Sequence, residues 1–340
     1  MPPKTEPNSA PAFAVCRDGE RLPDALRGAV VAIGNFDGVH RGHQVLLEAA
    51  IGEARRQGAP ALVLTFEPHP REFFAPQKPL FRLTPEAAKL AIFDRLGMDG
   101  AVVRRFDAAL AGTSARDFVG LLAGELGAAG VVVGHDFHFG KGREGNPALL
   151  EALARELGLQ SLIVPQVSLA GEPVSSSAIR AALEAGDIAR ANALLGYRWF
   201  VQGEVRHGEK RGRTLGFLTA NIRLPENCRL RHGIYAVRAA LGAGEMRDGV
   251  ASFGRRPTFD NGAPLLEVFL FDFSGDLYGR LIEVELVGWI RAEERFPSAD
   301  ALMARMNEDA GTARRMLAQA ERGNAASLIG KLRPRPYPVA

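Results

Sequence analysis

The 340-residue sequence predicts a parallel α/β sheet followed by an antiparallel β-structure that ends in helices. Two observations carry this prediction. Continuous apolar runs alternate with amphipathic helical stretches up to about residue 183, and short strand-like segments between turns begin at Tyr197. Apolar strands with helices between them are typical of a parallel sheet covered on both faces. Short strands separated by Gly, Asn, Asp and Pro turns are typical of a barrel or a sandwich.

The first half of the chain alternates strands with helices. We expect strands at 29–33, 61–66, 101–106, 131–133 and 162–164, and helices at 45–57, 85–96, 114–126 and 147–157. Polar loops follow the first, second and fourth of these strands. Because ligands bind such sheets outside the carboxyl ends of the strands, we expect these three loops to meet at one edge.

The second half begins with two short helices, one after Ser175 and one that ends at Leu195. We expect strands at 199–205, 234–241, 249–253, 265–271 and 281–286, then helices at 299–306 and 312–320. The alternation of strands and helices gives way to short strands near residues 184–197. This change predicts domains over 25–186 and 187–325, a disordered N-terminal tail over 1–24 and a basic, Pro-rich tail over 326–340.

Composition and charge narrow the class of protein. Hydrophobic residues make up 46% of the chain and charged residues 24%, as in a soluble globular protein. The two cysteines, Cys16 and Cys228, have no metal-ligand or disulfide spacing, which indicates reduced thiols and a cytoplasmic protein. No apolar stretch reaches the roughly 20 residues that cross a bilayer, so we expect no membrane partner. Basic residues crowd the stretch 206–231, which suits nucleic acid or a small polyphosphate; without interleaved aromatics we favour the small anion.

The stretch Gly34–His43 reads Gly-Asn-Phe-Asp-Gly-Val-His-Arg-Gly-His between an apolar strand and a helix. Helix N-termini bind anions, and glycines let the backbone approach a ligand closely. His40 and His43 are three residues apart, so both can face one side of the first helical turn. Imidazoles beside a phosphate site can donate hydrogen bonds to charge that develops on a transferred phosphoryl group. A structural strand–turn–helix is the alternative, but histidines are not preferred helix caps.

Two further stretches of the first half also carry residues that suit a ligand. In Gly134–Gly140, Asp136 and Phe137 suit a planar ligand ring, although alternating aromatics beside a strand are commonly core residues. The run Gly140–Gly145 matches G-x-G-x-x-G, but it lies too far past its strand for a dinucleotide site. Ser175–Ser177 predicts a capped helix start, and Arg180 one turn later suits a phosphate clamp.

The second half carries a glycine- and arginine-rich run, 203–217, followed by Leu218-Thr219-Ala220-Asn221. It predicts a flexible loop over phosphates, or else a solvated basic hairpin. The oxygens of Thr219 and Asn221 suit a hydrated Mg²⁺ ion. Glu267 is a carboxylate within a strongly apolar strand, and it is either exposed on a strand face or a general base for a hydroxyl nucleophile.

Taken together, these motifs resemble the prokaryotic bifunctional riboflavin kinase/FMN adenylyltransferase (FAD synthetase) family. The resemblance covers about residues 25–320 and keeps the order of several motifs: 33–44, 65–74, 131–140, 175–180, 203–221, 256–259 and 266–279. It implies a Rossmann-like nucleotidylyltransferase domain followed by an antiparallel β-barrel riboflavin kinase domain with C-terminal helices. The N-terminal domain would transfer AMP from ATP to FMN, and the barrel would phosphorylate riboflavin with ATP and Mg²⁺.

The resemblance also implies site residues. The ATP site of the adenylyltransferase would comprise Gly34, Phe36, Asp37, Gly38, His40, His43, Ser176 and Arg180. The FMN site would comprise Phe66, Pro68, His69, Asp136 and Phe137. The kinase ATP site would comprise Gly203, His207, Gly216, Thr219 and Asn221, of which Thr219 and Asn221 would contact the metal. The catalytic residues would be His40, His43, Arg180 and Glu267.

One departure from the family's pattern and two other readings complete the expectations. Leu218 stands where the family has Pro, which frees φ and predicts a kinase that survives with weaker substrate affinity. There are two alternatives. In the first, only the adenylyltransferase is active. In the second, the protein is a flavin-responsive, nucleic-acid-binding regulator that uses residues 206–231. We expect small-molecule substrates, no nucleic acid, and a monomer or weak homo-oligomer.

Overall fold

The computed structural model of the chain describes residues 13–206, 219–242, 245–255 and 264–320. The chain forms two compact units. The first comprises Met1–Phe36, Gly42–Lys78 and Lys89–Val167, and the second comprises Asp37–Arg41, Pro79–Ala88 and Ser168–Ala340. Two short segments of the first half, 37–41 and 79–88, therefore belong with the second unit.

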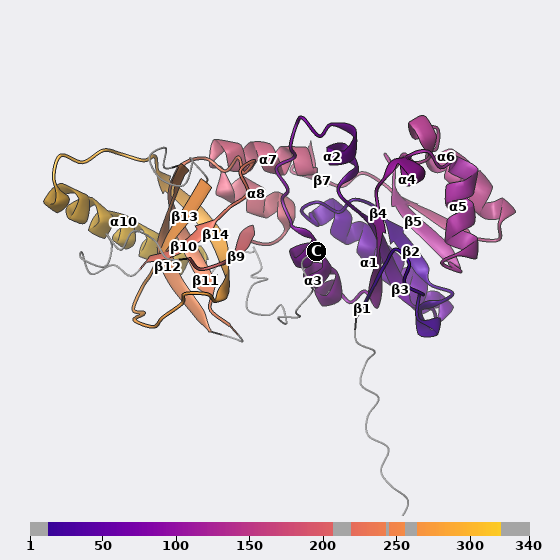
Figure 1. Ribbon diagram of the computed structural model, residues 1–340, viewed down its shortest axis with the longest axis horizontal. Coiled ribbons are helices and arrows are strands. Elements are labelled where there is room, and N and C mark those ends of the chain that lie inside the picture. Colours follow the sequence, from indigo (N-terminus) through magenta and orange to yellow (C-terminus); the bar gives the residue numbers. More distant parts are fainter. Residues whose placement is uncertain (1–12, 207–218, 243–244, 256–263, 321–340) are drawn as a thin grey trace, which may run out of the picture. The chain divides into compact units, whose positions relative to one another are not determined.

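The first unit contains a six-stranded parallel sheet with the order β1-β4-β3-β2-β5-β6 (Figure 1). Its strands are β1 (Ala14–Arg17), β2 (Val30–Ile33), β3 (Ala61–Glu67), β4 (Gly100–Arg105), β5 (Gly130–Gly134) and β6 (Gln160–Val164). The order reverses between β2 and β5, so the loops after these two strands flank the point where such sheets bind ligands. The predicted parallel α/β fold is confirmed.

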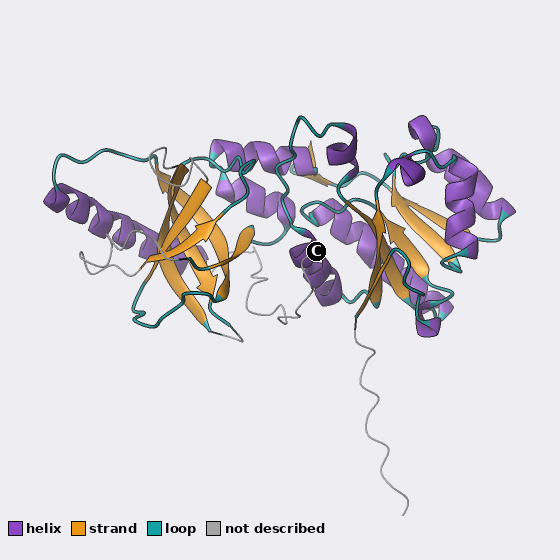
Figure 2. Ribbon diagram, viewed as in Figure 1, coloured by secondary structure: helices purple, strands orange, loops and turns teal. Residues whose placement is uncertain are grey.

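Helices cover both faces of this sheet, as the apolar strands require (Figure 2). They are α1 (Arg41–Gln57), α2 (Pro70–Phe74), α3 (Glu86–Leu96), α4 (Ala108–Ala111), α5 (Ala115–Gly124) and α6 (Pro147–Glu156), with short 3₁₀ turns η1 (Asp24–Leu26) and η2 (Lys141–Arg143). Residues of α5 and α6 form one core with alternate residues of β2, β3 and β5, including Val31, Leu64 and Val133. Side chains also cap helix starts: the Ser114 hydroxyl accepts a hydrogen bond from the Asp117 amide.

The predicted disorder of residues 1–24 is wrong for its described part. Residues 14–17 form β1, which pairs in parallel with β4 at the sheet edge. Phe13, Cys16, Leu22 and Leu26 are buried, and this burial stabilises a segment whose local sequence is only weakly strand-like. Residues 1–12 lie outside the described residues, as do 321–340, which contain the predicted basic tail.

The second unit contains a six-stranded antiparallel sheet with the order β10-β13-β12-β11-β14-β9. Its strands are β9 (Phe200–Glu204), β10 (Thr219–Arg223), β11 (Gly233–Ala240), β12 (Met246–Arg255), β13 (Pro264–Leu270) and β14 (Leu281–Arg291). The two end strands approach each other: the Arg206 amide donates to the Asn221 carbonyl at 2.9 Å. A Cβ at Gly203 would lie 2.4 Å from the Ile222 Cγ2 atom, so only glycine allows this approach. The sheet is a nearly closed barrel, as predicted.

Two short helices follow Ser175, as the sequence predicts. α7 (Ser176–Ala185) is capped by Ser175, whose hydroxyl accepts from the Ala178 amide at 3.2 Å, and α8 (Ile188–Leu195) follows it. A small hairpin, β7 (Ser168–Leu169) and β8 (Glu172–Pro173), precedes them. The two predicted C-terminal helices form one continuous helix, α10 (Ala299–Ala320).

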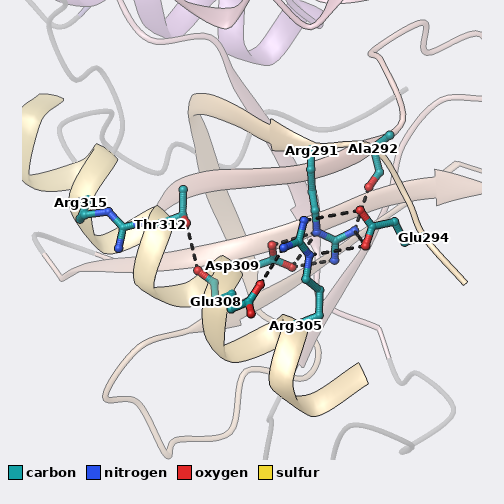
Figure 3. A network of polar contacts seen from close by, with 8 residues as sticks. All are labelled: Arg291, Ala292, Glu294, Arg305, Glu308, Asp309, Thr312 and Arg315. Atoms are coloured by element: carbon teal, nitrogen blue, oxygen red, sulfur yellow. Dashed lines mark hydrogen bonds and ion pairs between the residues drawn. The ribbon is translucent and has the colours of Figure 1, made fainter. Parts of the chain in front are cut away.

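An ion pair fastens α10 to the barrel (Figure 3). The Nε and Nη2 atoms of Arg291 on β14 lie 2.7–3.1 Å from the carboxylate oxygens of Asp309 on α10. Both side chains are largely buried, 11% and 6% exposed. Arg305 lies beside this pair and contacts the exposed carboxylate of Glu308 at 2.7 Å. The helix also packs Ala313 and Leu317 against Ala236 and Phe271 of the barrel side.

We predict that Asp309→Ala lowers the free energy of unfolding by about 3–5 kcal/mol, because the largely buried guanidinium of Arg291 loses its hydrogen-bonded carboxylate and keeps only the more distant Glu294 at 3.6 Å. Glu308→Ala is the matched control. It removes an exposed ion pair from the same helix and is expected to cost less than about 1 kcal/mol. Urea unfolding followed by circular dichroism measures both changes. Equal losses for the two variants would show that the buried ion pair contributes no more to the free energy of unfolding than the exposed one.

Candidate active sites

The loop after β2 begins with Gly34, which a ring of the same loop covers. A Cβ at Gly34 would lie 3.2 Å from the Phe36 ring, so a side chain here would require the ring to move by a few tenths of an ångström. Phe36 is completely buried and contacts the rings of His43 (centroids 5.2 Å apart) and Phe93 (5.3 Å) edge-on. The Phe36 side chain is therefore packed in the core against His43, and its predicted contact with ATP stays a prediction.

The middle of the loop has an unusual backbone. Phe36 and Val39 adopt positive φ angles of 51° and 33°, and Gly38 has a φ of 88°. A positive φ is strained for a non-glycine residue, above all for a β-branched one such as Val39. Such conformations persist only where the surrounding structure holds them, so the contacts of residues 37–41 decide the shape of the loop.

Within the second unit, Asp37 is the centre of these contacts. Its Oδ1 atom accepts hydrogen bonds from the amides of Leu83 (2.9 Å) and Thr84 (3.1 Å), and its Oδ2 atom accepts one from the Arg180 guanidinium. The Thr84 hydroxyl accepts from the Gly38 amide at 2.9 Å. The carboxylate of Asp37 thus joins the loop to the segment 79–88 and to α7.

Burial raises the pKa of Asp37, while the Arg180 guanidinium and the amides of Thr84 and Leu83 act in the opposite direction. Burial is the larger effect. The carboxyl group therefore loses its charge at a higher pH than an exposed aspartate does, and its ion pair with Arg180 weakens as the pH falls.

Ser176 and Arg180 lie on α7 next to this centre. The Ser176 hydroxyl donates to the Asp37 carbonyl at 2.8 Å, and Arg180 Nε donates to the Phe81 carbonyl at 2.7 Å. The Arg180 side chain is only 12% exposed. The structure thus places both residues as supports of the segments 37–41 and 79–88; their predicted contact with phosphate stays a prediction.

The two histidines occupy the start of α1. His43 lies in the first turn of the helix, and its ring packs against Phe36. His40 directly precedes Arg41, the first residue of the helix, and is 7% exposed. Both imidazoles therefore lie at a helix N-terminus, where the partial positive charge of the helix favours an anion.

The predicted FMN residues lie at the carboxyl ends of β3 and β5 in the first unit. Phe66 packs edge-on against Phe106 just after β4, and the rings of Phe73 and Phe74 on α2 join them. Phe74 is 67% exposed, so an apolar ring surface faces solvent here. Pro68 follows Phe66 on the way to α2, and the His69 Nδ1 atom caps that helix by accepting from the Arg71 amide at 3.1 Å.

After β5, the Asp136 side chain is exposed and Phe137 is half-buried. The Phe137 ring stacks on Phe139, with centroids 5.4 Å apart and planes 15° apart. Phe139 belongs to the core, so it fixes the plane of Phe137 at the rim of the sheet. Asp136 and Phe137 thus lie just after β5 at this edge of the sheet; their contact with a flavin stays a prediction.

In the barrel, the register of β10 and β13 brings the predicted kinase residues together. Asn221 lies directly opposite Glu267, and Thr219 directly opposite Phe269. Opposite residues of antiparallel strands share a face, so the amide, the hydroxyl and the carboxylate lie on one side of the sheet. This is the outer side, because Leu266, Val268 and Leu270, which alternate with Glu267 and Phe269, are buried in the barrel.

Asn221 has an unusual environment within this face. Its side chain is almost fully buried, and its Oδ1 atom has no hydrogen-bond partner among the residues that the structure describes. Buried polar atoms are nearly always partnered in folded proteins, so this oxygen is a candidate ligand contact within the described residues. Of the other predicted kinase residues, Gly203 packs closely against Ile222, as described above. His207 and Gly216 lie outside the described residues.

Comparison with known proteins finds one family model for each half of the chain. A family model described as FAD synthetase matches residues 22–178, and one described as riboflavin kinase matches residues 195–317. The bifunctional riboflavin kinase/FMN adenylyltransferase of Escherichia coli (strain K12) is 43% identical over 289 residues, which cover 84% of this chain and 92% of the relative. The protein of the same name from Haemophilus influenzae is 40% identical, over 85% of this chain and 94% of the relative.

The chain belongs to the bifunctional riboflavin kinase/FMN adenylyltransferase family. A solved structure, described as a macrolide-efflux protein from Streptococcus pneumoniae, is also similar, with a TM-score of 0.76 and 29% identity over 85% of this chain and 94% of that one. In the parts of the chain that the structure describes, no helix combines the length and apolarity needed to cross a membrane.

One residue of this family member that the sequence did not reveal is Lys89 on α3. It is 1% exposed, and its Nζ atom lies 2.9 Å from Glu67 Oε1, 3.2 Å from Thr65 Oγ1 and 3.3 Å from the Asn35 carbonyl. The ammonium group therefore joins the loop after β2 to the end of β3, which leads into the predicted FMN residues. A lysine on an amphipathic helix ordinarily indicates the solvent face, so no local pattern pointed to it.

We predict that Lys89→Met lowers the free energy of unfolding by about 3 kcal/mol, because it removes the buried ammonium group that lies 2.9 Å from the Glu67 carboxylate. The double variant Lys89→Met/Glu67→Gln should recover part of this loss, since it also removes the charge that this ammonium group offsets. Urea unfolding of the four proteins measures the effect. A single variant as stable as the parent, or a double variant that shows the sum of two losses, would contradict this assignment.

Proposed function

We propose that this chain makes FMN from riboflavin and ATP, and FAD from FMN and ATP, at separate sites. The observation that carries the proposal is that each family model falls on its own sheet: FAD synthetase on the parallel sheet and riboflavin kinase on the barrel. Both reactions are direct displacements at phosphorus, so positioning and neutralisation of charge supply most of the catalysis. No protein nucleophile is needed.

In the adenylyltransferase reaction, an oxygen of the FMN phosphate forms a bond to the α-phosphorus of ATP, and the bond to pyrophosphate breaks. His40 and His43 would donate hydrogen bonds to the charge that develops on the phosphoryl oxygens. The backbone of the loop and the start of α1 would bind the triphosphate, with Asp37, Ser176 and Arg180 holding the loop in shape. The exposed aromatic surface at the end of β3 and Phe137 after β5 suit the flavin ring.

In the kinase reaction, the terminal hydroxyl of the ribityl chain attacks the γ-phosphorus of ATP, and ADP leaves. Glu267 would accept the hydroxyl proton as general base. It lies on the outer face of the barrel, directly across from Asn221, in agreement with a role beside the nucleotide.

The residues of this face fit a magnesium ion. Mg²⁺ prefers oxygen ligands and keeps much of its water, and the buried Asn221 Oδ1 atom is such an oxygen without a protein partner in the described residues. Asn221 and Thr219 would hold the ion, which would neutralise charge on the phosphate oxygens when bound. The described ranges contain no cluster of three or more His, Cys, Asp and Glu side chains placed to share a metal, so we expect the ion to arrive with ATP.

The partners and setting follow from the same observations. We propose catalytic domains over 25–186 and 187–325 and a cytoplasmic monomer or weak homo-oligomer. Both cysteines are buried and form no disulfide. Arg229 pairs with Glu184 at 3.0 Å, and the Arg231 guanidinium lies 4.1 Å from the centre of the Trp289 ring. Because Arg229 and Arg231 have protein partners, these two side chains give little support to nucleic-acid binding.

A chromatographic time course with riboflavin, ATP and Mg²⁺ tests both sites in one experiment. The parent chain should form FMN and then FAD. His43→Ala should stop at FMN, with FAD formation slowed by at least about 100-fold, and Glu267→Gln should form FAD only from added FMN. Glu245→Gln, which removes a half-exposed carboxylate near the start of β12, is the control and should behave as the parent does.

Each assignment has its own contradicting result in this time course. FAD formation by His43→Ala at the parental rate would remove His43 from the site, and phosphorylation of riboflavin by Glu267→Gln would remove Glu267. Turnover of FMN but not of riboflavin by the parent would favour a degraded kinase, with Leu218 as the first suspect. Turnover of neither flavin would contradict the proposed function.

A further inference from the structure

The segment that leads into the barrel also holds the loop of the predicted adenylyltransferase site. Tyr197 is 2% exposed, and its hydroxyl donates a hydrogen bond of 2.7 Å to the carbonyl of Gly38, where the loop has a left-handed backbone. Both residues belong to the second unit. Burial raises the pKa of the Tyr197 phenol far above its ordinary value, so the group is a neutral donor at every pH of interest.

Trp199, two residues later, holds the neighbouring segment in a similar way. Its Nε1 atom donates to the Leu83 carbonyl at 2.9 Å, and its ring packs edge-on against Phe81. Leu83 is the residue whose amide donates to the Asp37 carboxylate. The two carbonyls fixed by Tyr197 and Trp199 therefore belong to the two segments that Asp37 joins.

The barrel fixes the position of this segment in turn. The Asn192 side chain accepts from the Trp199 amide at 2.8 Å and donates to the Leu286 carbonyl of β14 at 3.1 Å. The Leu286 amide donates to the Trp199 carbonyl at 2.8 Å. The segment is thus bonded on one side to the longest strand of the barrel and on the other to the segments 37–41 and 79–88.

We propose that Tyr197 and Trp199 are positioning residues for adenylyl transfer, although they lie on the kinase side of the chain. A loop with positive φ at Phe36, Gly38 and Val39 keeps this backbone only if surrounding groups hold it, and Tyr197 holds the central carbonyl. This inference rests on the proposed function, because it takes Gly38 and Asp37 to belong to the adenylyltransferase ATP site. Its consequence is that the first predicted domain depends on residues beyond its boundary for its own reaction.

The test compares Tyr197→Phe with Tyr235→Phe in the full-length chain. Tyr235 is also fully buried, and its hydroxyl also donates to a backbone carbonyl, that of Arg231, but it has no part in the predicted adenylyltransferase site. Both variants lose one buried hydrogen bond of the same kind. We expect Tyr197→Phe to lower kcat/KM for FAD formation by about 10-fold or more, chiefly through KM for ATP, with riboflavin phosphorylation unchanged. Tyr235→Phe should leave FAD formation at the parental value.

A second variant and a second readout keep the inference open to refutation. Trp199→Phe keeps an aromatic ring against Phe81 but lacks the indole N–H, and it should show the same selective loss. Hydrogen–deuterium exchange should be faster over 37–41 in Tyr197→Phe and unchanged over β5. Unaltered FAD formation by Tyr197→Phe, or equal losses of both activities in Tyr197→Phe and Tyr235→Phe, would overturn the inference. No FAD from the parent chain would instead overturn the proposed function, and this inference with it.

Discussion

The buried carboxylate of Asp37 is the interaction on which the predicted adenylyl-transfer site depends. It accepts hydrogen bonds from Arg180 on α7 and from the amides of Leu83 and Thr84, so it joins three stretches of chain that are far apart in the sequence. A buried carboxylate is stable only when its charge is compensated, and each of these three donors provides part of that compensation. Loss of any one of these hydrogen bonds leaves the negative charge of Asp37 incompletely compensated.

This arrangement explains why a strained loop can exist in the fold. The sheet supplies the start of the loop through Gly34 and Phe36, and the second unit supplies the contacts of residues 37–41. The strand β2 is entirely buried, and its rigidity alone cannot fix a backbone that turns through three positive φ angles. The kinase face needs no such device. Its residues lie on paired strands, where the antiparallel register already sets Asn221 against Glu267.

Much of this fold was readable from the sequence, for physical reasons. Parallel strands are buried on both faces, so β2 and β3 appear as unbroken apolar runs, and Ser175 and Gly186 mark the ends of α7 by capping. β1 was missed because an edge strand of four residues has no clear pattern of its own. β10 was missed because Thr219 and Asn221 were interpreted only as oxygen ligands and not as one face of a strand.

The site was predicted in part for the same reasons. Glycines and histidines in one short loop carry a local signal, and the structure places them between β2 and α1 as expected. Lys89 and Tyr197 carry none, because the partners of Lys89 lie 22 to 54 residues away and that of Tyr197 lies 159 residues away, so only the tertiary fold brings them together. Phe36 was assigned to ATP because it lies within the motif; its ring is buried in the core, and the assignment stays a prediction.

The most direct test of this account is a double-mutant cycle on FAD formation with Asp37→Asn, Arg180→Gln and the double variant. If the two side chains act through one interaction, each single variant loses most of the adenylyl-transfer rate and the double variant is little worse than either. Riboflavin phosphorylation by the same proteins should stay at the parental rate. Losses that multiply in the double variant would show that Asp37 and Arg180 act independently, and would contradict the central role of their ion pair.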